Sequence, residues 1–285
     1  MTRIEREENG LVDLKELIRA GVHFGHRTSR WNPKMSPYIL KKRNLIHIID
    51  LRQTVRGLVT AKYLAEAVGQ RGEYVLFVGT KRQARNIIKA EAERCNMPYV
   101  CERWPGGLLT NYATIRQRLE RLVELENLDR TGEINRYSKK MISSLRREQR
   151  KINRNLGGVR NMKRLPGLLV VVDPQREHLA VKEGAKLAIP TIAWTDTDGD
   201  PSDLDVCVPA NDDAIGSIQI FARTMADAVL TGTKRRQATQ ARTAMERTEG
   251  AGEKPEVKAA QADAATAAAQ DQPVAEGAGA EQAGQ

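Results

Sequence analysis

Short apolar runs alternate along this chain with longer stretches that have the periodicity of amphipathic helices. The strongest runs lie at residues 46–49, 74–78, 168–172 and 191–194, with weaker ones at 98–101 and 206–208. The four strongest lack the polar–apolar alternation of a half-exposed strand, so we expect them to be covered on both faces. Strand followed by helix, repeated, predicts parallel βαβ units in a layered α/β domain.

Capping residues are expected where three of the helices begin, at Asp50, Thr80 and Asp173. The first two are followed by glutamine at capping-box spacing, and the third is followed by proline, which suits the first helical position. A fourth helix is expected to begin at Asn211, with one apolar face made of Ile215, Ile218, Phe221, Ala222 and Met225. These signals place a helix after three of the strongest strands and after the weaker run at 206–208.

Residues 111–160 interrupt the alternation of strands and helices because they contain no strand-like run. Two apolar stripes at helical spacing flank a turn at Gly132: Ile115, Leu119, Leu122 and Leu125, then Met141, Leu145, Ile152, Leu156 and Val159. Glycine pairs at 106–107 and 157–158 would let the chain leave and re-enter the α/β domain sharply. We therefore expect an inserted antiparallel helical hairpin, a coiled-coil arm, in which residues 111–164 hold fifteen basic and six acidic residues.

The predicted organisation is a discontinuous α/β sandwich domain at 1–110 and 161–232, the inserted arm at 111–160 and a tail at 233–285. The tail is first basic and then rich in alanine, glycine and acid. From residue 249 it has thirteen alanines, five glycines and no aromatic residue. Such a composition buries too little surface to offset its ordering entropy, so we expect disorder there, with a fragment of Ala-rich helix as the alternative.

The net charge of +10 is unevenly spread. Residues 1–248 hold forty-four bases and twenty-nine acids, whereas 165–248 taken alone are mildly acidic. A one-sided basic field suits a polyanion such as nucleic acid or an anionic membrane surface. No apolar run reaches membrane-spanning length, the N-terminus lacks a signal-peptide pattern, and three cysteines favour a reducing compartment, so we expect a cytoplasmic protein.

Enzyme motifs are weak here. No P-loop or dinucleotide-binding fingerprint is present, although Lys81, Arg82 and Arg85 after the second strand could bind a phosphate or belong to an ordinary turn. Asp196 and Asp198 in DTDGD resemble the nucleophile motif of haloacid-dehalogenase-type phosphatases, with an acidic turn as the alternative. His23 and His26 lack evident further metal ligands. We therefore expect no catalytic residue, metal or cofactor.

Basic segments interleaved with aromatic residues carry the stronger functional signal. Residues 25–43 contain six cations and no acid, and two prolines within them favour an extended loop suited to phosphates and unpaired bases. A second cluster surrounds the first glycine pair, and the third is the arm. The candidate RNA-binding residues are Arg27, Arg30, Trp31, Lys34, Lys41, Lys42, Arg43, Lys81, Arg82, Arg103, Trp104, Asn111, Arg116, Arg146, Arg147, Arg150, Arg154, Lys163 and Arg164.

Five motifs in this order carry a family resemblance: HFGHRTSRWNPKM (23–35), FVGTKRQA (77–84), RWPGGLLTN (103–111), LGGVRNMKRLPGLLVVVDPQREHLAV (156–181) and VPANDDAIGSI (208–218). Together they closely resemble the bacterial-type family of the second protein of the small ribosomal subunit. The resemblance covers about residues 11–232. Pro105 departs from it, because the family usually has leucine there.

The resemblance implies a flavodoxin-like α/β sandwich with a protruding coiled-coil hairpin. It also implies a non-catalytic ribosomal protein that binds small-subunit ribosomal RNA, joins late in assembly and helps the large first protein of that subunit to dock. Two alternatives stay open at this point: a phosphatase built on Asp196 and Asp198, and an RNA-binding regulator that never joins a ribosome.

Overall fold

The computed structural model describes residues 13–251, with side chains described up to residue 243. The chain divides into two compact units, Met1–Gln237 and Ala238–Gln285. Residues 249–251 continue the last helix, and residues 252–285, where the composition predicts disorder, lie outside the described residues. All contacts that position the site lie within the first unit.

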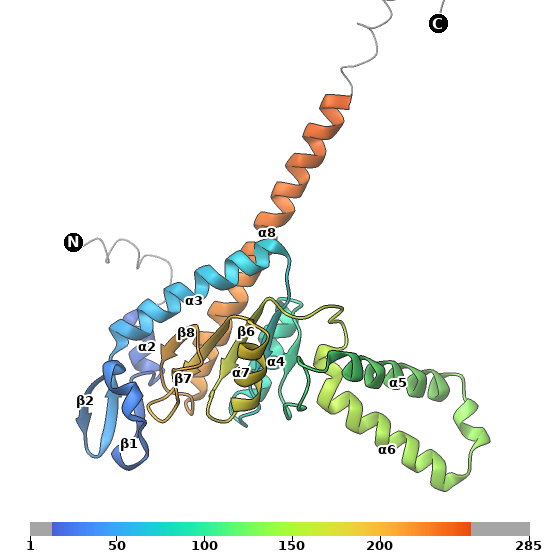
Figure 1. Cartoon of the computed structure of the whole chain (residues 1–285), viewed down its shortest axis with the longest axis horizontal. Coiled ribbons are helices and arrows are strands. Elements are labelled where there is room, and N and C mark those ends of the chain that lie inside the picture. The colour runs from blue at the N-terminus through green and yellow to red at the C-terminus, as the bar shows by residue number, and fades with distance from the viewer. Residues whose placement is uncertain (1–12, 252–285) are drawn as a thin grey trace, which may run out of the picture. The chain divides into compact units, whose positions relative to one another are not determined.

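Five parallel strands form the central sheet in the order β5-β4-β6-β7-β8 (Figure 1). Counted along the chain this is the 2-1-3-4-5 order of flavodoxin-type sheets. All residues of β4, β6 and β7 are buried, which confirms the expected coverage on both faces for those runs. The strands are β4 (Val75–Val78), β5 (Tyr99–Val100), β6 (Leu168–Val172), β7 (Thr191–Thr195) and β8 (Val206–Pro209).

Helices cover both faces of this sheet because successive strand residues point to opposite sides. Phe77 and Trp194 belong to the core shared with α2, α3, α4 and α8, whereas Leu76 and Val171 belong to the core shared with α7 and the first turns of α5. Each fully buried large apolar side chain stabilises the fold by about 1.5–3 kcal/mol. These helices are α2 (Leu14–Arg19), α3 (Leu51–Arg71), α4 (Arg85–Arg94), α5 (Tyr112–Arg130), α7 (His178–Lys186) and α8 (Ile215–Ala251).

Residues 46–49 form a strand outside the parallel sheet, which corrects one prediction. This strand, β3 (Ile46–Ile49), pairs antiparallel with β1 (Phe24–Arg27) and β2 (Ile39–Arg43). Burial alternates along it, with His47 and Ile49 inside. The alternation is hidden in the sequence because isoleucine occupies positions on both faces.

The helix starts match the sequence signals only in part. Asp50 caps α3 and accepts a hydrogen bond from the Arg52 amide, as expected. Thr80 does not begin a helix, because α4 starts at Arg85 and the Thr80 hydroxyl is bound to Glu177. Asp173 has a positive φ of 64°, which a helix N-cap does not adopt, and α7 starts only at His178.

Asn211 does not directly precede the helix either, because α8 starts at Ile215; its side-chain oxygen accepts from the amides of Asp213 and Ala214 in the turn before α8. Four residues of the expected apolar face are buried, but Ile215 is 61% exposed. The helix continues to Ala251, well past the apolar pattern. In the described part of the chain, α8 included, no helix has a stretch long and apolar enough to span a bilayer.

Residues 111–160 contain no strand, and they form two helices, α5 and α6 (Lys139–Leu156), that pack on each other. Short 3-10 turns follow each helix, η3 (Glu133–Arg136) and η4 (Gly157–Val159). The first predicted stripe is fully buried, but Met141 of the second is 47% exposed. In Figure 1 this helical arm, coloured green, projects beyond the β-sheet. It leaves from the β5 side, where η4 contacts β5.

Candidate nucleic-acid interface

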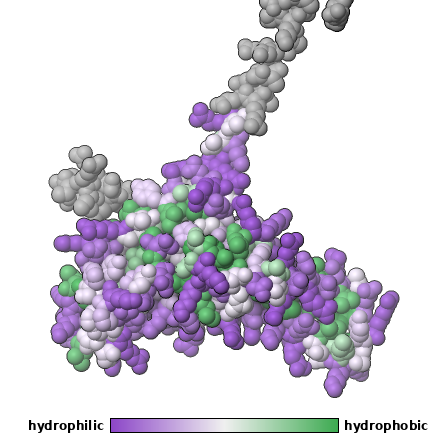
Figure 2. Space-filling view, viewed as in Figure 1, coloured by the Kyte–Doolittle hydropathy of each residue, from purple (hydrophilic) through white to green (hydrophobic). Residues whose placement is uncertain are grey.

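The basic N-terminal segment is not the extended loop that the sequence predicts. Two 3-10 helices, η1 (Thr28–Arg30) and η2 (Pro33–Tyr38), lie between β1 and β2, because Asn32 caps the second and Pro33 occupies its first position. Most of the predicted RNA-facing side chains are nevertheless exposed, and Figure 2 shows hydrophilic residues in this region together with some hydrophobic ones. Those that are exposed without a carboxylate partner among the described residues are Arg27, Arg30, Lys41, Lys42 and Arg43.

Trp31 and Lys34 have partners within the protein. The Trp31 ring lies 5.1 Å from that of His47 and is 38% exposed, so one part of it stays open for stacking. Lys34 Nζ lies 2.8 Å from Asp200 Oδ2 and donates to the Ser202 hydroxyl at the same distance. The Lys34 hydrogen bond lowers the pKa of Asp200 to about 2. The ammonium group has three N–H donors and the Lys34 side chain is exposed, so one donor remains for a phosphate beside Asp200 and Ser202.

Thr197 anchors this segment to the end of β7. Its hydroxyl accepts a hydrogen bond from the His26 amide at 2.9 Å, and its carbonyl accepts from the Asn32 amide at 2.8 Å. His26 Nδ1 also lies 2.9 Å from Asp196 Oδ2, and this hydrogen bond raises the pKa of His26 to about 9. The segment is therefore fixed at both ends of η1 by one turn of the α/β domain.

Lys81, which the sequence offers as a phosphate ligand, is paired with acids of the protein itself. Its ammonium group lies 2.7 Å from both Asp212 and Asp213 and 3.5 Å from Asp173, with 13% of the side chain exposed. Burial alone would lower the pKa of Lys81, but these carboxylates raise it above its ordinary value. The pKa of Asp212 is raised to about 7, mainly because the group is buried and secondly because other carboxylates lie near it. The neighbouring Arg82 is exposed and stays a candidate.

This ionic cluster fills the place where flavodoxin-type sheets bind ligands. That place lies beyond the carboxyl ends of the strands at which the sheet order reverses, here β4 and β6. His26, Asp196 and Asp212 each offer one ligand atom, all within 4.8 Å of one another, so they could hold a metal ion. Lys81 and a protonated His26 bind the same carboxylates and would therefore compete with a metal ion for them. Neither histidine spacing nor the DTDGD motif alone predicts this grouping.

Asp196 does not have the accessibility that a phosphatase nucleophile needs. Its side chain is 2% exposed and is held by His26 and by the Thr197 amide. The second acid of that hypothesis, Asp198, faces His26 at 3.9 Å. The acidic motif is therefore a structural turn that binds the N-terminal segment.

The loop at residues 103–111 is held by one carboxylate on α7. Glu183 accepts hydrogen bonds from Trp104 Nε1 at 3.0 Å and from the amides of Gly107, Leu109 and Thr110 at 2.8–3.2 Å. Burial acts against the charged form, but these donors outweigh it and lower the pKa of Glu183. Trp104 is only 5% exposed, so it packs in the core rather than presenting a face for base stacking.

The other two candidates from this loop are exposed. Arg103 has no carboxylate partner among the described residues, and Asn111 binds the Thr114 hydroxyl at 2.9 Å.

The basic residues of the arm fall into two groups, those with a carboxylate partner and those without one among the described residues. All six of its acids lie within 4.0 Å of an arginine, and the arginines paired in this way are Arg116, Arg121, Arg136, Arg146 and Arg160. The other ten basic residues of 111–164 have no carboxylate partner in the described part of the chain; from the predicted set they include Arg147, Arg150, Arg154, Lys163 and Arg164. Arg164 instead donates to the Gly72 carbonyl and lies over the Tyr74 ring.

Sequence reasoning missed the acids that organise this surface, Asp173, Glu183 and Asp212. One available signal was that Asp173 and Asp196 each directly follow a predicted strand, since the carboxyl ends of parallel strands meet at one edge of the sheet. Glu183 gave no comparable signal, because it lies within an ordinary helical pattern.

Comparisons with known proteins give a consistent result. A family model described as "Ribosomal protein S2" matches residues 17–232. A protein of Rhodopirellula baltica called "Small ribosomal subunit protein uS2" is 54% identical over 80% of this chain and 88% of its own length. Proteins with the same name from Syntrophobacter fumaroxidans and Lawsonia intracellularis are 50% and 52% identical, over 81% and 78% of this chain and 84% and 76% of their own lengths.

Proposed function

Because the chain belongs to the ribosomal protein S2 family, which makes it a structural protein of the small ribosomal subunit in the cytoplasm and not an enzyme, we propose that it binds small-subunit ribosomal RNA through its N-terminal basic segment and its helical arm. The observation that carries this proposal is the division of charge on the arm. Ten of its cations have no carboxylate partner among the described residues, and a set of such charges of one sign favours an external counter-charge.

The geometry of the α/β domain supports the same function. The N-terminal strands and 3-10 helices are fixed to the end of β7 by Thr197, so exposed Arg27 and Arg30 are presented on a rigid mount. Rigid presentation lowers the entropy lost when a phosphate is bound. The arm is fixed at its root by Glu183 and by the packing of η4 against β5.

Within the subunit, the protein is expected to join late in assembly and to help the large first small-subunit protein to dock. This part of the proposal rests on family membership alone.

The direct test is a filter-binding titration of the full chain against small-subunit RNA at increasing salt. Several phosphate contacts should make the logarithm of the affinity fall linearly with the logarithm of the salt concentration, by about one unit of slope for each contact. A flat dependence contradicts electrostatic binding.

Incorporation into subunits tests which surface faces the RNA. Reversing Arg27, Arg30 and Lys34 to glutamate should reduce co-sedimentation with small subunits in sucrose gradients. The matched control reverses Lys89, Lys182 and Lys186, which are exposed on α4 and α7 and give the same change in net charge. Equal incorporation of the two variants would place the RNA on a different face.

A further inference from the structure

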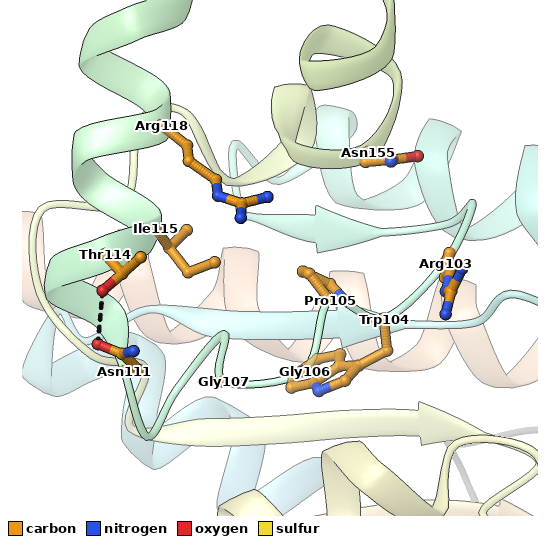
Figure 3. Close-up of a pocket in the computed structure, with 10 residues that line it drawn as sticks. All are labelled: Arg103, Trp104, Pro105, Gly106, Gly107, Asn111, Thr114, Ile115, Arg118 and Asn155. Carbon is orange, nitrogen blue, oxygen red and sulfur yellow. Dashed lines mark hydrogen bonds between the residues drawn. The ribbon is translucent and has the colours of Figure 1, made fainter.

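An open cleft of about 400 Å³ lies where the arm joins the α/β domain (Figure 3). One wall is the loop that contains Arg103, Trp104 and Pro105, and the other is the first turns of α5 with Asn111, Ile115 and Arg118. The size is within the range of about 300–1,000 Å³ that is usual for small-ligand sites. Nothing in the ionic cluster at the sheet edge contributes to it.

Two arginines face this cleft with no internal partner. Figure 3 shows Arg118 extending from α5 and Arg103 on the opposite side, with Pro105 and Trp104 between them. Neither guanidinium has a hydrogen-bonding or ionic partner among the described residues, although every acid of the arm is paired with another arginine. Two unpaired arginine side chains that line one cleft suit phosphate groups, because a guanidinium can bind a phosphate with two parallel N–H donors.

The walls of the cleft are preorganised. Glu183 lies behind the loop, does not line the cleft, and has its charge covered by Trp104 Nε1 and three backbone amides. Ile115 is 5% exposed and is therefore buried like Trp104, so the apolar side chain of this wall that is open to a ligand is that of Pro105. A base can stack against a proline ring of this kind.

A second cleft of about 250 Å³ shares Arg118, Ile115 and Pro105 with the first and continues to Lys151 on α6. Its one acid, Glu148, lies 3.7 Å from Arg121 and is therefore paired. The cationic side chains thus follow a path from Arg103 to Arg118 to Lys151. A path of this kind fits successive phosphates of a polyanionic backbone better than it fits a single small anion.

We propose that this cleft holds an unpaired nucleotide of RNA, with its phosphate bound by Arg103 or Arg118 and its base on Pro105. The inference rests on the proposed RNA-binding function and adds a preference for single-stranded RNA, because a base within a duplex cannot turn into a cleft. The cleft would thereby distinguish unpaired RNA from duplex RNA, whereas the other cations of the arm would contact the phosphate backbone of either.

The test compares two probes, a short oligouridylate and a blunt RNA duplex of equal length, in filter binding with the full chain. Arg103→Gln combined with Arg118→Gln should weaken oligouridylate binding about tenfold for each arginine. Duplex binding should weaken no more than in the control Lys139→Gln with Lys140→Gln, which removes two unpaired charges from the far end of the arm. Equal losses on both probes for both variants would overturn the proposal.

A second variant blocks the cleft without changing any charge. A Cβ added at Gly106 meets no atom within 4 Å, so the side chain of Gly106→Leu starts in open space at the cleft wall, and circular dichroism checks that the variant is folded. It should reduce binding of oligouridylate but not of the duplex, and Gly106→Ala should bind both probes like the wild type. Photo-cross-linking of 4-thiouridine-containing oligonucleotide should label residues 103–118, and labelling confined to other segments would contradict the proposal.

The outcomes separate the two proposals. If the wild-type protein binds neither probe, the RNA-binding function fails. If it binds both probes and the cleft variants match their controls, only the cleft assignment fails. If polyglutamate of matched charge displaces oligouridylate from the wild type but not from the Arg103/Arg118 variant, the cleft is a site for an acidic peptide and the nucleotide assignment is wrong.

Discussion

The Glu183 carboxylate on α7 accepts a hydrogen bond from Trp104 Nε1 at 3.0 Å, across seventy-nine positions of sequence. The same carboxylate accepts hydrogen bonds from the backbone amides of Gly107, Leu109 and Thr110, in the loop that leads into the arm. The orientation of the arm's root therefore depends on one acidic side chain of the α/β domain. A residue outside the basic segments thus controls how those segments are presented.

Glu183→Gln should destabilise the fold, because an amide nitrogen would face backbone N–H donors that now bind a carboxylate oxygen. We expect a loss of about 1.5–3 kcal/mol in the free energy of unfolding at pH 7, the usual value for one hydrogen bond to a charged group. Urea denaturation followed by tryptophan fluorescence measures it. The control Glu120→Gln, on the exposed surface of the arm, should change stability by less than about 0.5 kcal/mol.

The pH dependence of this effect has a definite sign. Folding lowers the pKa of Glu183 from its ordinary value of 4.5, so its carboxylate stabilises the protein above that pH. This stabilisation is lost as pH falls through the folded-state pKa. The difference in stability between wild type and Glu183→Gln should therefore shrink below pH 4.5, and a constant difference down to the acid transition would contradict the assignment.

Lys81→Met should be strongly destabilising, because Asp212 is 2% exposed and loses its nearest positive charge. Breaking a buried pair by removing one partner costs about 3–5 kcal/mol. Arg82→Met is the matched control. Arg82 is the exposed neighbour of Lys81, and its substitution should change the free energy of unfolding by only about 0.5 kcal/mol or less. If thermal or chemical denaturation shows the two variants to be alike, Lys81 does not neutralise this cluster.

The pKa of Asp200 reports whether Lys34 moves to a phosphate when RNA binds. Its pKa of about 2 depends first on the Lys34 hydrogen bond, and NMR titration should find it closer to its ordinary value of 3.8 in Lys34→Gln. Because the folded pKa is lowered, the pair favours folding above pH 3.8 and loses that effect as pH falls towards 2.

In the RNA-bound protein the pKa of Asp200 should rise if Lys34 moves to a phosphate. An unchanged value would show that Lys34 keeps its bond to Asp200 when RNA is bound.

Gly158→Ala should disturb the root of the arm, whereas Gly106→Ala should not. A Cβ at Gly158 would overlap the Tyr99 carbonyl oxygen, and backbone atoms of a strand cannot move aside easily. Overpacking of this kind costs about 1–3 kcal/mol. Circular dichroism and urea denaturation of both variants check it, and a neutral Gly158→Ala would show that η4 can shift away from β5.

Sequence periodicity determined the layered α/β class, the parallel strands and the helical insertion. Those features follow from local patterns, because a buried strand such as β6 needs a continuous apolar run and the arm needs stripes at helical spacing. The exposed cations of the N-terminal segment could also be predicted, since six bases without an acid cannot be neutralised within the segment.

Only the tertiary structure decided which charged residues are free. Lys81 and Arg82 are adjacent and chemically alike in the sequence, yet Lys81 is surrounded by acids from the ends of β6 and β8 and Arg82 is exposed. Similarly, Trp104 is buried against Glu183 while Arg103 opens onto the cleft. Pairing is set by groups far apart along the chain, and electrostatic interaction depends on distance in space and on burial, which sequence spacing does not supply.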